Sequence, residues 1–194
     1  MERTEKGYTT GQDALTTDEV RILLSKINDY EDLALFSLAI STGIRREDVV
    51  AIELCNVHDT GDVVTISFWE AKKKRTWKVM LSGEAALNMR RHLTAKAKTD
   101  RYLFSARKGP DKEKRHISGR QAYNLLQDAL ERGGLRKRPF HALRSTCMKL
   151  CQKRGWTAEQ TMRLTGDSWR VVQAHYVTPS DDEMNQTVKE KALL

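Results

Sequence analysis

The fold class is decided by the stretch VVTISFWEAKKKRTWKVML, which occupies residues 63–81. Its two ends, residues 63–69 and 76–81, are rich in the β-branched and aromatic side chains that favour strands. The basic segment AKKKR lies between them at residues 71–75, so the stretch predicts a β-hairpin with a cationic tip. The turn sequence TGD at residues 60–62 indicates one further strand before the hairpin. We therefore expect a small three-stranded antiparallel sheet.

Outside this stretch, hydrophobic residues recur at the spacing of helices. The sequence TTDE at residues 16–19 has the form of a capping box and predicts the start of the first helix. A second, largely buried helix is expected at residues 33–40, stopped by the Thr-Gly pair at 42–43. Further helices are predicted at about residues 49–54, 82–98, 118–132, 139–154, 157–164, 168–176 and 180–192. The expected fold class is mainly α with a small antiparallel β-sheet (α+β).

The chain of 194 residues is long enough for one domain with a substantial core. We expect residues 1–14 to be a flexible lead-in, residues 15–179 the domain, and residues 180–194 a tail helix. No apolar run approaches the roughly 18 to 20 residues of a membrane span, and there is no signal peptide. An odd set of cysteines argues against a disulfide framework: Cys55, Cys147 and Cys151. We therefore expect a cytoplasmic protein with no membrane partner.

Charge is unevenly distributed along the chain, whose formal net charge is +8. Residues 1–65 carry 6 basic and 13 acidic side chains, whereas residues 66–194 carry 28 and 13. The positive charge is concentrated in three stretches, at residues 69–78, 101–120 and 132–154. Such segregation fits a polyanion such as DNA or RNA, although a solvated charged surface has the same composition.

Metal and nucleotide sites are disfavoured by the sequence. Cys147 and Cys151 lie four residues apart on one predicted helix and His141 precedes them, but no second cluster completes a four-ligand zinc site. Neither a Walker loop nor a dinucleotide-binding glycine pattern is present. We expect chemistry that uses no metal and no cofactor.

Four other features carry side chains suited to chemistry on a phosphodiester. Arg45 directly follows a predicted helix stop, and Asp48 three residues later could hold its guanidinium rigid. His141 and Arg144 are three residues apart at a helix start, which places them on one helical face. The other two features are the hairpin lysines and a histidine-tyrosine pair: Lys72, Lys73, Lys74, His175 and Tyr176. Alone, each could be an ordinary ion pair, lysine run or packing residue.

Together these side chains indicate a phosphoryl-transfer site that needs no metal. Two arginines can bind the nonbridging oxygens of the transition state bidentately. A tyrosine hydroxyl can attack phosphorus and form a covalent phosphotyrosine, which conserves the bond energy for religation. A lysine or histidine would protonate the departing 5′ oxygen or accept the tyrosine proton.

The order and spacing of these motifs resemble the catalytic domain of the tyrosine recombinases, which include phage and archaeal integrases and chromosome-dimer resolvases. The matching features are TGIRRED at residues 42–48, the lysine hairpin, His141-x-x-Arg144 and Tyr176. The resemblance extends from about residue 16 to the C-terminus. It implies the tyrosine recombinase catalytic-domain fold for residues 15–179.

The resemblance also implies roles for individual residues. Arg45 and Arg144 match the two arginines that hold the scissile phosphate, and Tyr176 matches the nucleophile. His141 matches the histidine that assists proton transfer or donates a hydrogen bond to phosphate. Asp48 stands where the family more often has glutamate, bracing the first arginine.

The hairpin lysine is less firmly matched. Counting back from VML at residues 79–81, where the family often has a Val-Pro-Leu-like strand, favours Lys72 as the general acid. Lys73 is the second choice, because hairpin lengths vary within the family.

Asp167 departs from the family pattern, which usually has histidine or tryptophan nine residues before the tyrosine. A carboxylate cannot donate a hydrogen bond to phosphate unless protonated, and its charge opposes the developing anion. Three readings remain open: Asp167 orients an arginine, His175 or Trp169 fills the vacant role, or the enzyme is slow. We favour the first.

The resemblance implies a site-specific recombinase or integrase that cleaves and rejoins DNA through a 3′-phosphotyrosine. Its implied partners are double-stranded DNA, three further copies of the chain in a tetramer, and accessory DNA-bending proteins, in the nucleoid or the cytoplasm of a virus's host. Two alternatives are a type IB topoisomerase-like enzyme and a noncatalytic DNA-binding protein on the same fold.

Too few residues precede Arg45 for the additional N-terminal domain with which the family usually clamps DNA. The chain is therefore expected to be a catalytic fragment or a minimal recombinase. The tail at residues 180–194 could dock on a neighbouring protomer or pack on its own domain.

Overall fold

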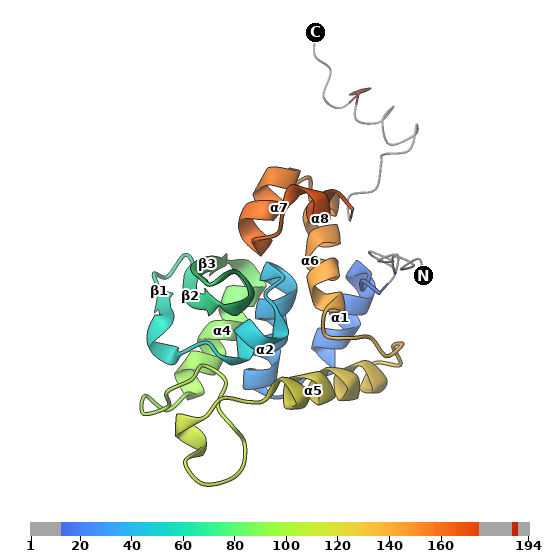
Figure 1. The fold of residues 1–194 in the computed structure, drawn as a ribbon. Helices are drawn as coiled ribbons and strands as arrows, with labels where there is room; N and C mark the ends of the chain where they lie inside the picture. Colours follow the sequence, from blue (N-terminus) through green and yellow to red (C-terminus); the bar gives the residue numbers. More distant parts are fainter. Residues whose placement is uncertain (1–12, 175–187, 190–194) are drawn as a thin grey trace, which may run out of the picture.

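The computed structural model describes residues 13–174 and 188–189 (Figure 1). The described residues form mainly helices together with one small antiparallel sheet, which confirms the expected fold class. The α-helices are α1 (Thr17–Ser25), α2 (Tyr30–Thr42), α3 (Arg46–Val50), α4 (Gly83–Ala95), α5 (Gly119–Arg132), α6 (Ala142–Lys153), α7 (Ala158–Thr165) and α8 (Trp169–Gln173). The strands are β1 (Val57–Asp59), β2 (Val64–Glu70) and β3 (Arg75–Leu81), and the 3-10 turns are η1 (Leu54–Asn56), η2 (Ala71–Lys73) and η3 (Lys112–Lys114).

The sheet has the strand order β1-β2-β3, and both pairings are antiparallel. The β2–β3 register runs from Val64 opposite Leu81 to Glu70 opposite Arg75, so the hairpin predicted from residues 63–81 is confirmed. Its tip is the turn η2, closed by Lys74 in the left-handed region at φ 50°. The alternation of buried and exposed residues along β2 shows that one face of the sheet packs on the core.

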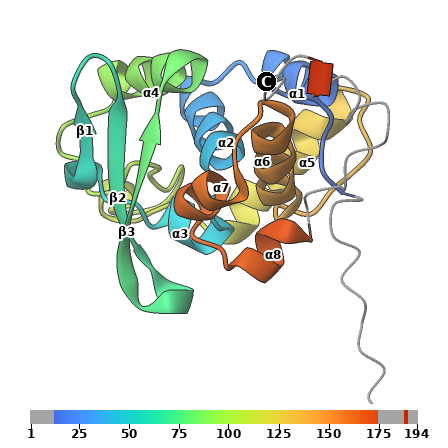
Figure 2. The ribbon, with the colours of Figure 1, turned by 90° about the horizontal axis from the view of Figure 1, so that it is seen from above.

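Helix α2 is the centre of the core. Most of its residues are buried, because its apolar side chains occupy every face rather than one stripe. Viewed from above, the sheet and α4 lie on one side of α2, and α1, α5 and α6 lie on the other (Figure 2). The C-terminal end of α2 points towards α3, α7 and the hairpin, where the functional candidates gather (Figure 2).

Most predicted helices are present, with one local error. The helix expected at residues 49–54 is wrong, because α3 ends at Val50 and a 3-10 turn follows at η1. Between them the carbonyl of Ile52 accepts a hydrogen bond from the Leu103 backbone N–H at 2.8 Å. This pairing with a distant loop competes with the helical pattern. The predicted end segments lie outside the described residues, apart from 13–14 and the helical pair 188–189.

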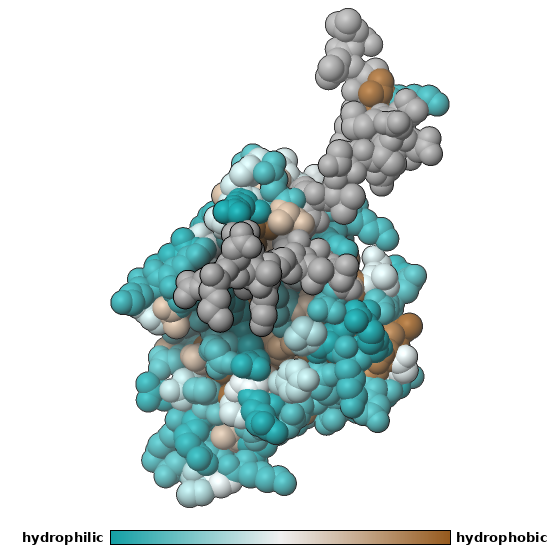
Figure 3. Space-filling model, turned by 45° about the vertical axis from the view of Figure 1, so that its right-hand side comes forward, coloured by the Kyte–Doolittle hydropathy of each residue, from teal (hydrophilic) through white to brown (hydrophobic). Residues whose placement is uncertain are grey.

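The described surface is strongly polar on the face shown in Figure 3. Hydrophilic residues cover most of it, and hydrophobic residues appear as small, separated areas. Among the helices of the described residues, none has the length and apolar character that a membrane span requires.

Gly43 ends α2 in the left-handed conformation at φ 63°. A Cβ there would lie 3.2 Å from Thr165 Cγ2 and 3.3 Å from Cys147 Cβ, so the position is also crowded. We expect Gly43→Ala to lower the free energy of unfolding by about 1–3 kcal/mol, measured by chemical denaturation. Gly83→Ala is the matched control, because Gly83 has φ 56° but no atom within 4 Å of the added carbon. An equal or smaller loss for Gly43→Ala would contradict this role of crowding.

Candidate active site

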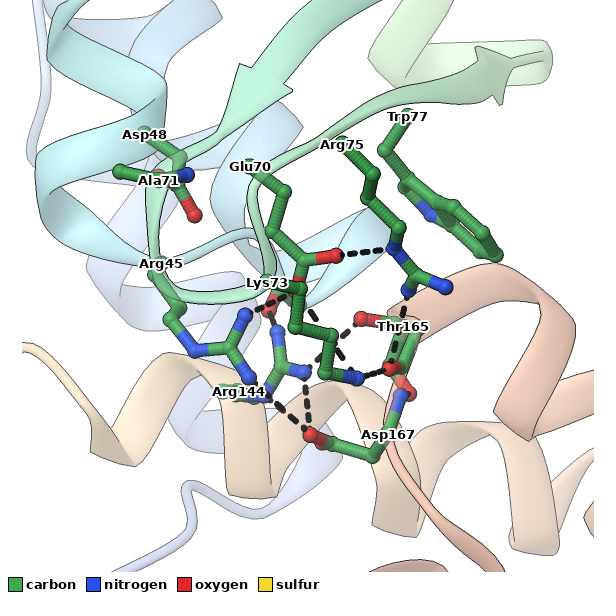
Figure 4. Close-up of polar contacts among 12 residues, drawn as sticks. Arg45, Asp48, Glu70, Ala71, Lys73, Arg75, Trp77, Arg144, Thr165 and Asp167 are labelled. Atoms are coloured by element: carbon green, nitrogen blue, oxygen red, sulfur yellow. Dashed lines mark hydrogen bonds and ion pairs between the residues drawn. The ribbon is translucent and has the colours of Figure 1, made fainter.

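Four segments distant in sequence converge at the C-terminal end of α2 (Figure 4). Arg45 occupies the N-cap position of α3, and Arg144 lies in the first turn of α6. Asp167 lies in the short loop between α7 and α8, and the β2–β3 hairpin contributes Glu70. The two arginines predicted from the motifs are thus brought together although they are far apart in the chain.

Arg144 is almost fully buried, with a relative exposure of 3%. Its Nε donates to Asp167 Oδ2 at 2.8 Å, and its Nη2 lies 2.7 Å from Oδ1 of the same carboxylate. Nη2 also donates to the Thr165 carbonyl at 2.8 Å, and Nη1 donates to the Gly43 carbonyl. Asp167 therefore holds the Nε–Nη2 edge of Arg144 in the bidentate manner with which arginine also binds phosphate.

Arg45 is less buried than Arg144 and is held by two carboxylates. Its Nη1 donates to Glu70 Oε1, and its Nη2 donates to Asp167 Oδ1 at 3.3 Å. A single oxygen of Asp167 thus bridges the two arginines. This geometry agrees with the first reading of Asp167, in which the carboxylate orients an arginine.

Asp48 does not have the partner that the sequence suggested. Its carboxylate accepts the backbone N–H of Ala71 at 3.2 Å and thereby anchors the start of the hairpin turn. The ion pairs of Arg45 with described residues are instead those with Glu70 and Asp167. Desolvation by burial raises the pKa of Asp48 above its ordinary value, partly offset by the hydrogen bond from Ala71. The correction arises because Asp48 lies on the buried side of α3, against the turn η2.

The contacts of the two candidate hairpin lysines differ. Lys73 donates to the Gly166 carbonyl and lies 4.0 Å from Glu70 Oε1, whereas Lys72 makes no hydrogen bond or ion pair with the described residues. Partial burial lowers the pKa of Lys73, while the charge of Glu70 opposes that shift. The positive charge of Lys72 contributes to lowering the pKa of His141. In this conformation Lys73, the second choice from the sequence, is the lysine beside the arginines.

His141 immediately precedes α6, three residues from Arg144, and part of its surface is open to solvent. Desolvation by the surrounding protein lowers the pKa of its imidazole below the ordinary 6.5, and the charge of Arg144 lowers it further. The neutral imidazole, which can accept or donate a proton, is therefore favoured at neutral pH.

Titration of His141 by NMR should give a midpoint below 6.5, with the signal assigned by its loss in His141→Gln. The unfolded chain binds a proton on His141 more readily than the folded protein does. Protonation of His141 therefore costs no stability while the pH stays above 6.5. The free energy of unfolding declines as the pH falls through 6.5 towards the lower folded pKa. A His141 midpoint above 6.5 would contradict the proposed environment.

His175 and Tyr176 lie outside the described residues, and α8 ends at Gln173 shortly before them. Trp169 was the other residue considered as a hydrogen-bond donor to phosphate in place of the residue at position 167. It lies at the start of α8 and is 44% exposed.

Cys147 and Cys151 are both buried on α6 as free thiols. A hydrogen bond between the two thiols and burial together raise the pKa of Cys147. Over the described part of the chain, no group of three or more histidine, cysteine, aspartate and glutamate side chains could hold a metal ion.

Glu70 is the site residue that the sequence interpretation missed. It is the last residue of β2, is 2% exposed, and contacts Arg45 and Arg75. A signal was present, since Glu70 is the one acid in the basic stretch at residues 69–78. Its position next to a predicted turn made it look like an ordinary solvent-exposed charge.

Comparison with known families agrees with this arrangement of motifs. The model of the phage integrase family matches residues 13–181, which is most of the chain. The chain belongs to the phage integrase family. No curated protein matches the sequence of this family member.

Solved structures of tyrosine recombinases share the fold of this phage integrase family member. XerA recombinase matches with 17% identity and a TM-score of 0.71, over 93% of this chain and 66% of its own. XerH recombinase bound to its difH substrate matches with 15% identity and a TM-score of 0.73, over 95% and 55%. A lambda integrase dimer bound to a core site matches with 14% identity and a TM-score of 0.65, over 87% and 51%. The chain thus spans between half and two thirds of the length of these structures.

Proposed function

We propose that residues 15–179 are the catalytic domain of a site-specific DNA recombinase that acts through a covalent 3′-phosphotyrosine. The observation that carries the proposal is the convergence of Arg45 and Arg144 on one carboxylate oxygen of Asp167. Two guanidinium groups held this close form a binding site for a tetrahedral oxyanion. Membership of the phage integrase family supports the same function.

In each step of the proposed reaction, one phosphorus–oxygen bond forms as another breaks. The hydroxyl oxygen of Tyr176 bonds to the scissile phosphorus, and the bond from phosphorus to the 5′ oxygen breaks. His141 or a basic group beside it accepts the tyrosine proton, and a hairpin lysine, Lys72 or Lys73, protonates the departing 5′ oxygen. Arg45 and Arg144 stabilise the negative charge on the nonbridging oxygens. Attack by a 5′ hydroxyl from a second duplex reverses the step and joins the strands.

In the proposed reaction, the Asp167 carboxylate must move away from Arg144. Arg144 has five N–H groups, and four of them are used by Asp167, Gly43 and Thr165. A phosphate that binds the Nε–Nη2 edge of Arg144 therefore replaces the Asp167 carboxylate. Arg45 keeps Nε and one N–H on each Nη for a second contact.

The proposed partners are double-stranded DNA and further copies of the chain, as a tetramer on DNA. The positive charge of residues 66–194 supports DNA binding, because each neutralised phosphate releases counterions. Structural neighbours include a lambda integrase tetramer bound to a Holliday junction, which supports the tetramer by likeness. Accessory DNA-bending proteins and a cytoplasmic location complete the proposal.

The test begins by selecting the DNA that the protein binds from a pool of random duplexes. The selected site is then made as a nicked suicide substrate, whose short 5′ fragment diffuses away after cleavage. We expect a protein–DNA adduct that survives denaturation and forms in the presence of a chelator. Tight binding with no adduct on any selected site would contradict the catalytic proposal.

A noncatalytic DNA-binding protein is the second candidate, and the bidentate Asp167–Arg144 pair is the observation that favours it. An arginine edge already neutralised by a buried carboxylate binds phosphate less readily. The suicide substrate separates the two functions, because a noncatalytic protein binds the selected site without forming an adduct.

A further inference from the structure

We propose that Glu70 is a positioning residue of the active site, which fixes the Arg45 guanidinium for phosphate binding and holds the hairpin closed beside it. The proposal rests on the proposed function, in which Arg45 binds the scissile phosphate.

Glu70 is a buried carboxylate placed by the sheet. It ends β2 directly opposite Arg75 on β3, and its side chain is only 3% exposed. A charge at such a position is unfavourable unless it is paired. The rigid strand register therefore sets the position of this carboxylate.

Both oxygens of Glu70 are engaged by cations. Oε1 accepts from Arg45 Nη1 and lies 4.0 Å from Lys73 Nζ, and Oε2 accepts from Arg75 Nε at 2.7 Å. Burial alone raises the pKa of Glu70, but hydrogen bonds from Arg75 and Arg45 outweigh it and bring the pKa below the ordinary value. Glu70 is therefore an anion at neutral pH.

The two carboxylates on Arg45 have different roles. Figure 4 shows Glu70 and Asp167 approaching its guanidinium from different sides. Asp167 also occupies the Nε–Nη2 edge of Arg144, from which the proposed reaction displaces it when phosphate binds. Glu70 does not contact Arg144 in any described hydrogen bond or ion pair, and it can remain on Arg45 throughout the reaction.

Glu70 also links Arg45 to the hairpin and to the loop after α7. Arg75, held by Glu70, donates through Nη2 to the Gly166 carbonyl at 3.3 Å and stacks 3.8 Å from the Trp77 ring centroid. Lys73 donates to the same carbonyl. Gly166 permits this approach, since a Cβ there would lie 2.8 Å from Arg75 Nη2. The same carboxylate thus orders an arginine and a lysine of the site.

Kinetics on the suicide substrate test the positioning role. With Glu70→Gln we expect the single-turnover rate of adduct formation at saturating DNA to fall by about tenfold to a hundredfold, because a misplaced arginine stabilises the transition state poorly. DNA affinity should stay equal or increase a few fold, since one negative charge is removed. Glu70→Asp, which keeps the charge, should recover part of the rate. Glu53→Gln, at a surface ion pair with Arg101, is the matched control and should change neither quantity.

Faster cleavage together with tighter binding in Glu70→Gln would overturn the proposal, because Glu70 would then be a competing anion. An unchanged rate would overturn it as well.

Arginine side-chain NMR gives a readout that needs no catalysis. With both Nη groups anchored, Arg45 should show slowed guanidinium rotation, its signal being assigned by its loss in Arg45→Lys. Glu70→Gln should speed the rotation of Arg45, whose remaining ion pair is the 3.3 Å contact with Asp167, but leave Arg144 restrained by Asp167, Gly43 and Thr165. A freely rotating Arg45 in the wild-type protein would overturn the proposal. If the wild-type protein forms no adduct but this restraint is present, the proposed function fails while the contact stands.

Discussion

Tyr176→Phe should abolish formation of the covalent protein–DNA adduct while DNA binding remains within about twofold of the wild type. The variant lacks only the hydroxyl oxygen that bonds to phosphorus, and no second nucleophile of the same kind is part of the proposed site. A loss of at least about a thousandfold is expected, since a phenyl ring cannot form the intermediate. The measurement is denaturing electrophoresis of the protein after reaction with labelled suicide substrate.

Tyr30→Phe is the control for this substitution. Tyr30 starts α2, is 53% exposed, and lies at the end of that helix remote from Arg45. This control should form the adduct at the wild-type rate. Adduct formation by Tyr176→Phe would instead show that another residue is the nucleophile.

Arg144→Ala should have the next largest effect, on both stability and cleavage. The substitution removes the partner of a carboxylate that is only 8% exposed, and breaking a buried pair costs about 3–5 kcal/mol of unfolding free energy. It also removes half of the phosphate clamp, so the cleavage rate should fall by about a hundredfold to a thousandfold. Chemical denaturation and single-turnover cleavage, well below the unfolding transition, measure the two effects separately.

A double-variant comparison isolates the buried pair. Arg144→Ala combined with Asp167→Ala should regain part of the lost stability, because no buried carboxylate is left with only its longer 3.3 Å contact to Arg45. Arg101→Ala is the surface control, since its ion pair with Glu53 is exposed and worth at most about 1 kcal/mol. Equal losses for Arg144→Ala and Arg101→Ala would show that the buried network contributes little.

The fold could be predicted from the sequence where local chemistry and burial agree. The hairpin at residues 63–81 combines strand-forming residues with a polar turn, and the capping box that begins at Thr16 marks the start of α1. The short helix expected at residues 49–54 was wrong because Ile52 pairs with Leu103, and pairing across about fifty residues leaves no local pattern.

The site could be predicted only in its motif residues. Arg45 and Arg144 follow recognisable signals, a helix stop with glycine and a His-x-x-Arg helix start, and the structure places them together. The partner of Arg45 was assigned to Asp48 because it is near in sequence. The structure instead brings Glu70 from the sheet and Asp167 from the α7–α8 loop.

The choice between Lys72 and Lys73 shows a second limit. Counting residues from the strand could not decide it, because both lysines belong to the turn η2 and only the folded turn shows which of them contacts Gly166. In the folded turn, which Lys74 closes at positive φ, Lys73 contacts the Gly166 carbonyl, and Lys72 makes no hydrogen bond or ion pair with the described residues.

The central claim is that Tyr176 attacks a phosphate held by Arg45 and Arg144. Its most direct test is mass spectrometry of the adduct after digestion with nuclease and protease. We predict that the nucleotide is attached through its 3′ phosphate to the peptide containing Tyr176, and that Arg144→Ala reduces the yield of that peptide. A nucleotide on any other residue, or an unmodified Tyr176 peptide from a covalent complex, would contradict the claim.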